Sequence, residues 1–199
     1  MDPIEQSRLA ATRWYPCRQY LRRSIPAELA GWLLDTASLT QRLLQLCAGQ
    51  FSVRVLSQSW DRPQRDEARA LGMRPDGQAL IRQVQLLCGN RPWVYARTVI
   101  PATSMCGRLQ RLAHLGNRPL GAMLFADPGM RRGRVELARI TPGQRLFAAA
   151  LQHSDGRPPT AIWGRRSVFR ITGKPLLVSE IFLPGFPTQC AAGTQWRAR

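Results

Sequence analysis

Lysine, histidine and metal-binding cysteine patterns are scarce in this sequence. Lys174 is the only lysine among 29 basic residues, and His114 and His153 are the only histidines. The five cysteines are odd in number, widely spaced, and free of any C-x-x-C pair or nearby histidine. This usage argues against a disulfide framework and a zinc site, so we expect reduced thiols and no metal. Ser104 lacks the G-x-S-x-G surroundings of a nucleophile elbow, and Ser/His and Cys/His hydrolases are disfavoured.

Long apolar runs and a secretory leader are also missing. No stretch reaches the uninterrupted apolar length of a bilayer span, and the N-terminus has no apolar core ahead of a small-residue cleavage site. We therefore expect a cytoplasmic protein. With 199 residues, of which 44% are hydrophobic, the chain is long enough for one substantial core. We predict a single domain over residues 1–199, with 1–23 and 185–199 peripheral or frayed.

Negative charge is in short supply. The formal net charge is +17 and the pI is about 11.5, a balance that can mark nucleic-acid binders. The arginines are nevertheless scattered, without a basic run, an RNP-like aromatic motif or a zinc-finger spacing. Specific nucleic-acid binding is therefore not expected, and a basic nucleic-acid binder is an alternative that rests on charge alone.

Six segments have the alternating pattern of strands, and most are joined by short turns. They cover 51–60, 79–88, 91–100, 133–140 and the two halves of 163–184, which a turn at 172–175 divides. Helical patterns occupy 24–35, 38–49, 106–116 and 117–125. Parallel pairing would need a helical crossover between each pair of strands, so this order predicts an antiparallel α+β fold.

Two charged residues break the apolar pattern of their strands. Glu180 shares a strand face with Leu176, Val178 and Phe182, and Arg82 falls among similar apolar residues of its own strand. A buried charge is costly unless it is paired. Two readings stay open: a buried salt bridge between Arg82 and Glu180, or a pocket in which they bind opposite ends of a small anionic ligand.

Two further arginines are adjacent in sequence, so they should point to opposite faces of a strand. These are Arg165 and Arg166. We expect at least one of them to be solvated.

Four segments together carry a family resemblance. They are LTQR at 39–42, IRQVQLLCGNRPWVYARTVIP at 81–101, RPLGAMLF at 118–125 and WGRRSVFRITGKPLLVSEIFLP at 163–184. In this order they resemble the chorismate lyases, the chorismate pyruvate-lyases of ubiquinone biosynthesis. The resemblance implies a single six-stranded antiparallel sheet, with helices on one face and helical flaps over an internal ligand pocket.

The resemblance also implies an activity and a site. Members convert chorismate to 4-hydroxybenzoate and pyruvate without a metal or organic cofactor. Arg82 matches the arginine that holds the ring carboxylate, with backbone N–H groups at Leu39 and Leu120 assisting from the flaps. Glu180 matches the glutamate that bonds the ring hydroxyl. Arg82 and Glu180 are thus the candidate catalytic residues.

Two points depart from the resemblance, and two further expectations stand beside it. Leu39 stands where methionine is familiar, which matters little for a backbone contact. The connection at 141–161 is longer than in compact members, and it either covers the pocket or decorates the surface. We expect a monomer. A non-catalytic ligand-sensing module of the same fold is the alternative function.

Overall fold

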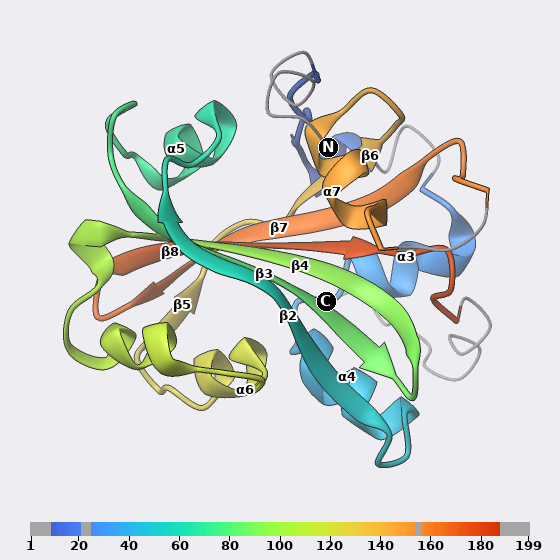
Figure 1. The fold of residues 1–199 in the computed structure, drawn as a ribbon, viewed down its shortest axis with the longest axis horizontal. Coiled ribbons are helices and arrows are strands. Elements are labelled where there is room, and N and C mark those ends of the chain that lie inside the picture. Colours follow the sequence, from blue (N-terminus) through green and yellow to red (C-terminus); the bar gives the residue numbers. More distant parts are fainter. Residues whose placement is uncertain (1–8, 21–24, 154–156, 188–199) are drawn as a thin grey trace.

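The fold is built on one antiparallel sheet whose strands differ in length (Figure 1). The structure is a computed structural model that describes residues 9–20, 25–153 and 157–187. The sheet order is β1-β6-β7-β8-β4-β3-β2, and β5 pairs with β7. The strands are β1 Tyr15–Pro16, β2 Phe51–Asp61, β3 Ala79–Cys88, β4 Arg91–Pro101, β5 Met130–Arg132, β6 Glu136–Ile140, β7 Ile162–Ile171 and β8 Lys174–Phe182.

The antiparallel α+β class is confirmed, but the predicted count of six strands is wrong because the described sheet has eight. The six expected strands are all present, and the two additional ones, β1 and β5, have two and three residues. β5 and β6 pair with successive parts of β7, and Gly133 lies between them. Elements this short do not show a period-two pattern in sequence, which is why they were missed.

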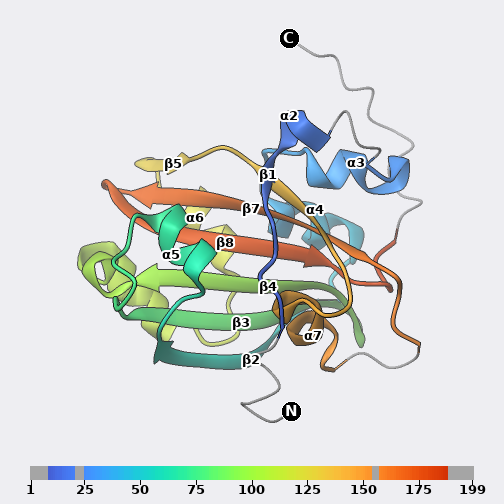
Figure 2. The ribbon, with the colours of Figure 1, turned by 90° about the horizontal axis from the view of Figure 1, so that it is seen from above.

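Helices cover both faces of the sheet, so the expectation of helices on one face is wrong. Figure 1 shows α4 (Leu39–Leu46) and α6 (Leu120–Phe125) on one side of the central strands, and α5 (Arg65–Leu71) and α7 (Arg145–Leu151) on the other. In Figure 2, α5 and α7 lie in front of the strands. Most of β3 is buried on both faces, and two covered faces are what such a strand requires.

Two apolar clusters fill the face under α4 and α6, which we call the front face. One also includes α3 (Ala27–Leu33), and the other includes the 3-10 helix η2 (Gly107–His114). The front-face strand residues include Val84, Ala96, Leu176, Val178 and Phe182.

The opposite, back face packs on α5 and α7. Leu71 of α5 and Leu146, Phe147 and Ala150 of α7 are buried there. The described part of the 141–161 connection therefore contributes to the back face and does not cover the front one.

The chain ends that we expected to be peripheral are partly built into the fold. Tyr20, in α2 (Cys17–Tyr20), is buried and makes an edge contact with Trp163, with 5.3 Å between the ring centroids. Phe186 packs in the same way on Trp32 at 4.9 Å. Residues 1–8, 21–24 and 188–199 lie outside the described residues, and with them Ser24, the first residue of the helical pattern over 24–35.

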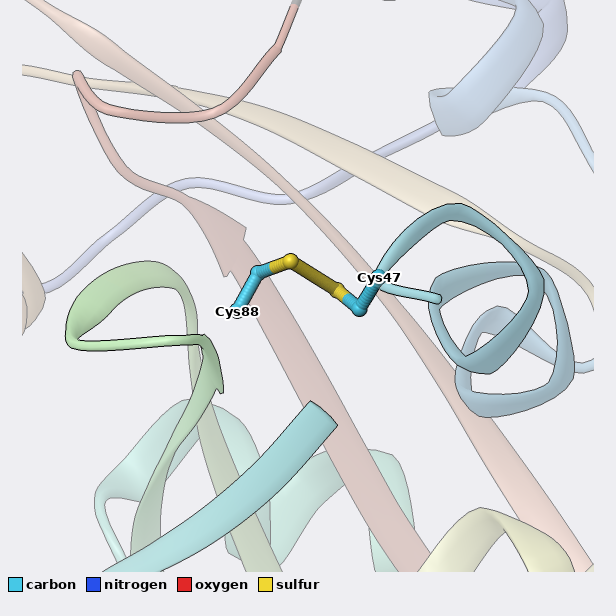
Figure 3. The surroundings of a disulfide bond; sticks show 2 residues. All are labelled: Cys47 and Cys88. Atoms are coloured by element: carbon cyan, nitrogen blue, oxygen red, sulfur yellow. A yellow bond between two sulfur atoms is a disulfide. The ribbon is translucent and has the colours of Figure 1, made fainter. Parts of the chain in front are cut away.

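The expectation of reduced thiols is wrong for two cysteines. Cys47, at the C-terminal cap of α4, and Cys88, the last residue of β3, form a disulfide (Figure 3). They are 41 residues apart in sequence, and their Cα atoms are 5.4 Å apart. Cys17 and Cys106 are free. Wide spacing hid this pair, because only the packing of α4 beside the end of β3 brings it together.

Replacing Cys47 and Cys88 with serine together is expected to lower the free energy of unfolding. Closing a loop of this length restricts the unfolded chain, and such crosslinks contribute about 2–4 kcal/mol. Urea denaturation followed by fluorescence measures the change, with Cys106→Ser, at an exposed free cysteine, as the control. Equal stability of the double variant and the control would contradict a stabilising disulfide.

Candidate active site

A cavity lies between the front face of the sheet and the first residues of α4 and α6. It is lined by all four site residues that the sequence predicts, namely Leu39, Arg82, Leu120 and Glu180. The rest of its wall is mainly apolar: Val53, Val84, Leu86, Ala96, Leu124, Phe125, Phe169 and Val178, with Ser38, Thr40 and Thr98 as polar members. A mostly apolar cavity with a few convergent polar groups is typical of a small-molecule site.

Glu180 is paired with Arg165. These residues lie directly opposite each other on β8 and β7. Arg165 Nε donates to Glu180 Oε2 at 2.6 Å, and the Arg165 side chain is only 2% exposed. Oε1 of Glu180 has no hydrogen bond within the described residues, and this carboxylate lines the cavity. Oε1 of Glu180 can therefore accept a hydrogen bond from a ligand while Oε2 stays bonded to Arg165.

Arg165 also fixes the chain that leads into α4. Its Nη1 donates to the backbone carbonyls of Trp32 and Asp35, both at 2.6 Å. α4 begins at Leu39, four residues after Asp35, where Ser38 Oγ accepts a hydrogen bond from Gln41 N at 3.4 Å. One buried guanidinium thus joins the carboxylate in the cavity to the segment that leads into α4.

Arg82 has only neutral partners. Its Nη1 donates to Gln58 Oε1 at 3.0 Å, and its Nη2 donates to Gly116 O at 2.6 Å, four residues before α6. The reading in which Arg82 and Glu180 form a salt bridge with each other is therefore wrong. Burial lowers the pKa of Arg82, and no carboxylate among the described residues pairs with it. An anionic ligand would supply the missing charge.

Register keeps Arg82 and Glu180 apart. Arg82 lies opposite Thr98 on β4, and Glu180 lies opposite Ala96 on the other edge of β4. Across the sheet, their Cα atoms are two strand spacings of about 4.8 Å apart. Along the strands they are offset by two residues of about 3.3 Å each, so the total separation is roughly 12 Å. Both side chains reach the same cavity, so the second reading, a ligand between a guanidinium and a carboxylate, fits this geometry.

α4 and α6 meet over the cavity. Leu39 and Leu120 are their first helical residues, so both lie in first turns, where backbone N–H groups lack intrahelical acceptors. Contact between the helices depends on Gly121, because a Cβ added there would lie 3.1 Å from Thr40 Cβ and closer still to Thr40 Oγ1. The absence of a side chain at Gly121 lets these two helix starts approach.

Comparison with known proteins decides the family. A family model described as chorismate lyase matches residues 9–190. A protein from Azoarcus sp. (strain BH72) named "Probable chorismate pyruvate-lyase" is 45% identical, over 81% of this chain and 87% of that protein. One of the same name from Methylococcus capsulatus is 43% identical, over 78% of this chain and 94% of that protein. The chain belongs to the chorismate lyase family.

Solved structures show the same fold in more distant proteins. A GntR-family transcriptional regulator from Bacillus cereus matches this chorismate lyase family member with a TM-score of 0.52 at 12% identity, over 75% of this chain and 98% of that one. The ligand-binding domain of a putative GntR-family regulator from Bordetella bronchiseptica gives 0.50 at 17% identity, over 69% and 87%. At such identities the likeness concerns the fold alone.

Sequence reasoning missed the role of Arg165 in this family member. We expected at least one of Arg165 and Arg166 to be solvated, and that is wrong. Arg166 is also buried, and on the back face it pairs with Asp66 and Glu136, both at 2.7 Å. Counting outward from the hairpin turn would have placed Arg165 opposite Glu180.

No metal site or membrane span appears in the described parts of the chain. Within residues 9–20, 25–153 and 157–187, no three His, Cys, Asp or Glu side chains gather in a way that could hold a metal ion. Over the same residues, no helix has both the length and the apolar character to cross a membrane.

Gly121→Ala is expected to weaken binding of ligands in the cavity by roughly tenfold or more. The new methyl group overlaps Thr40, so α4 and α6 must separate, and overpacking of this kind costs about 1–3 kcal/mol. Calorimetric titration with 4-hydroxybenzoate measures the change. Gly185→Ala is the control, since its nearest heavy atom would be Pro92 O at 3.6 Å. Unchanged affinity in Gly121→Ala would show that close contact between the helices is not needed.

Proposed function

We propose that this protein is a chorismate pyruvate-lyase, which converts chorismate to 4-hydroxybenzoate and pyruvate. The observation that carries the proposal is a buried Arg82, without a carboxylate partner among the described residues, that lines the same largely apolar cavity as Glu180 in a member of the chorismate lyase family. The ring of chorismate presents a carboxylate at one end and a hydroxyl at the other. These groups match a guanidinium that has no counter-ion, and a carboxylate oxygen that has no hydrogen bond, among the described residues.

In this proposal Arg82 binds the ring carboxylate and Glu180 Oε1 accepts a hydrogen bond from the ring hydroxyl. Backbone N–H groups at Leu39 and Leu120 add donors from the two flap helices. Arg165 binds Oε2 of Glu180 from the other side and holds the carboxylate in place, which leaves Oε1 for the ligand. The apolar wall surrounds the ring and limits the access of water.

The reaction eliminates the enolpyruvyl side chain. The bond between the ring and the ether oxygen breaks, the ring carbon that carries the hydroxyl loses its proton, and the enolpyruvate takes up a proton to become pyruvate. The ring becomes aromatic, which supplies much of the driving force. A site that holds the side chain in a reactive conformation can lower the barrier largely by positioning. Arg82 and Glu180 hold the two ends of the ring in that role.

We also propose that the chain acts as a single-domain monomer and needs no metal or organic cofactor. It binds no specific nucleic acid, and it supplies 4-hydroxybenzoate for ubiquinone biosynthesis.

A ligand-sensing module is not favoured, because the regulator structures are 12–17% identical whereas the lyase relatives are 43–45% identical.

Incubating the purified protein with chorismate and separating the products tests the activity. We expect equal amounts of 4-hydroxybenzoate and pyruvate. Binding of chorismate without turnover would instead indicate a sensor, and would overturn the proposal.

Arg82→Ala and Glu180→Gln test the two ends of the site. Each loses a hydrogen bond to a charged group, so we expect kcat/KM for chorismate to fall by roughly 10- to 100-fold. Arg54→Ala, at an exposed arginine on the neighbouring strand β2, is the control and is expected to keep full activity. Circular dichroism confirms that the variants are folded. Full activity in folded Arg82→Ala and Glu180→Gln would refute the assignment of the site.

A further inference from the structure

Chorismate carries a second carboxylate, which the product 4-hydroxybenzoate lacks. It belongs to the enolpyruvyl side chain, whose ether oxygen sits on the ring carbon next to the one that bears the hydroxyl. If the hydroxyl faces Glu180 and the ring carboxylate faces Arg82, this second carboxylate lies near the Glu180 end. A carboxylate brought into such an enclosed region needs a cation there.

Two arginines, one beside Glu180 and one beside Asp35, already have carboxylate partners. Arg165 pairs with Glu180 and also bonds two carbonyls. Arg42 pairs with Asp35 at 2.7 Å and lies over the ring of Trp32, 3.6 Å from its centroid. Neither is available for a further anion without losing its present partner.

Arg132 differs, because all its partners are neutral. It lies on β5 opposite Phe169, which lines the cavity, and its guanidinium carbon is 5.2 Å from the centroid of that ring. Nε donates to Ser167 Oγ at 3.1 Å, and Nη1 donates to Thr36 O at 2.7 Å. No described carboxylate forms an ion pair with it.

The electrostatic setting of Arg132 also favours an anion. Burial and the nearby charge of Arg165 lower the pKa of Arg132 to about 10, although Glu180 and Asp35 partly oppose the shift. Arg132 is therefore still charged near neutral pH. A bound carboxylate would offset both the desolvation and the repulsion from Arg165.

We propose that Arg132 binds the side-chain carboxylate of chorismate, next to the Glu180 end of the cavity. This inference rests on the proposed lyase function and adds a residue that distinguishes the substrate from the aromatic product. In the elimination, Arg132 holds the departing side chain while Arg82 and Glu180 hold the ring. After the ether bond breaks, Arg132 interacts with pyruvate and no longer with the ring.

Arg132→Ala and Arg132→Gln test this role by comparing substrate with product. We expect kcat/KM for chorismate to fall by roughly 10- to 100-fold in both variants, because a charge-assisted hydrogen bond is lost. The Kd of 4-hydroxybenzoate, measured by calorimetric titration, is expected to stay within about threefold, since this ligand has no side-chain carboxylate. Arg132→Lys, which keeps the charge, is expected to recover part of kcat/KM.

Arg131→Ala is the matched control, because Arg131 is the exposed neighbour on the same short strand. It is expected to behave as the wild type. Thermal unfolding of every variant reports on the role of Arg132 in holding Thr36. Arg132→Gln retains an amide donor for that contact without the charge, so it remains informative if Arg132→Ala does not fold.

Three results would overturn the inference. Full kcat/KM in Arg132→Gln would show that the residue does not contact the substrate. Equal losses for chorismate and for 4-hydroxybenzoate would assign Arg132 a purely structural role. Failure of Arg132→Lys to exceed Arg132→Gln would show that the charge is irrelevant. Wild-type protein that does not turn over chorismate would instead refute the proposed function, so the two failures are distinguishable.

Discussion

Arg165 is an almost fully buried guanidinium, and such a group is costly to desolvate unless its donors are matched. Here Glu180 supplies the opposite charge, and the carbonyls of Trp32 and Asp35 take further donors. The ion pair between Arg165 and Glu180 therefore has two roles in the site. It keeps a carboxylate in an apolar cavity, and it anchors the segment that precedes α4. Removing either partner would leave an uncompensated buried charge, which typically costs about 3–5 kcal/mol.

A parallel arrangement surrounds Arg82 on the other side of the cavity. It bonds the carbonyl of Gly116, ahead of α6, just as Arg165 bonds carbonyls ahead of α4. Gln58 reinforces it, because its amide donates to Ala113 O at 2.7 Å while its carbonyl accepts from Arg82. The sheet thus positions both flap helices through buried arginines. The difference lies in charge, since Arg165 has a carboxylate partner and Arg82 has none among the described residues.

Much of this could be predicted from sequence, because strand periodicity reports burial directly. Alternation placed Arg82 and Glu180 on apolar strand faces, and the helical pattern over 38–49 located α4. The pairing partner of Glu180 was missed because it depends on register. Thr172 and Gly173, both with positive φ, form a two-residue hairpin loop that sets Arg165 against Glu180. Tertiary packing alone brings Cys47 to Cys88, and strands as short as β1 and β5 leave no periodic signal.

The proposed site places a small aromatic acid between Arg82 and Glu180, under the first turns of α4 and α6. A crystal structure with bound 4-hydroxybenzoate tests it most directly. We expect the carboxylate within hydrogen-bonding distance of the Arg82 guanidinium, and the hydroxyl at Glu180 Oε1 with the Arg165 ion pair intact. A ligand bound in the reverse orientation, or outside this cavity, would contradict it.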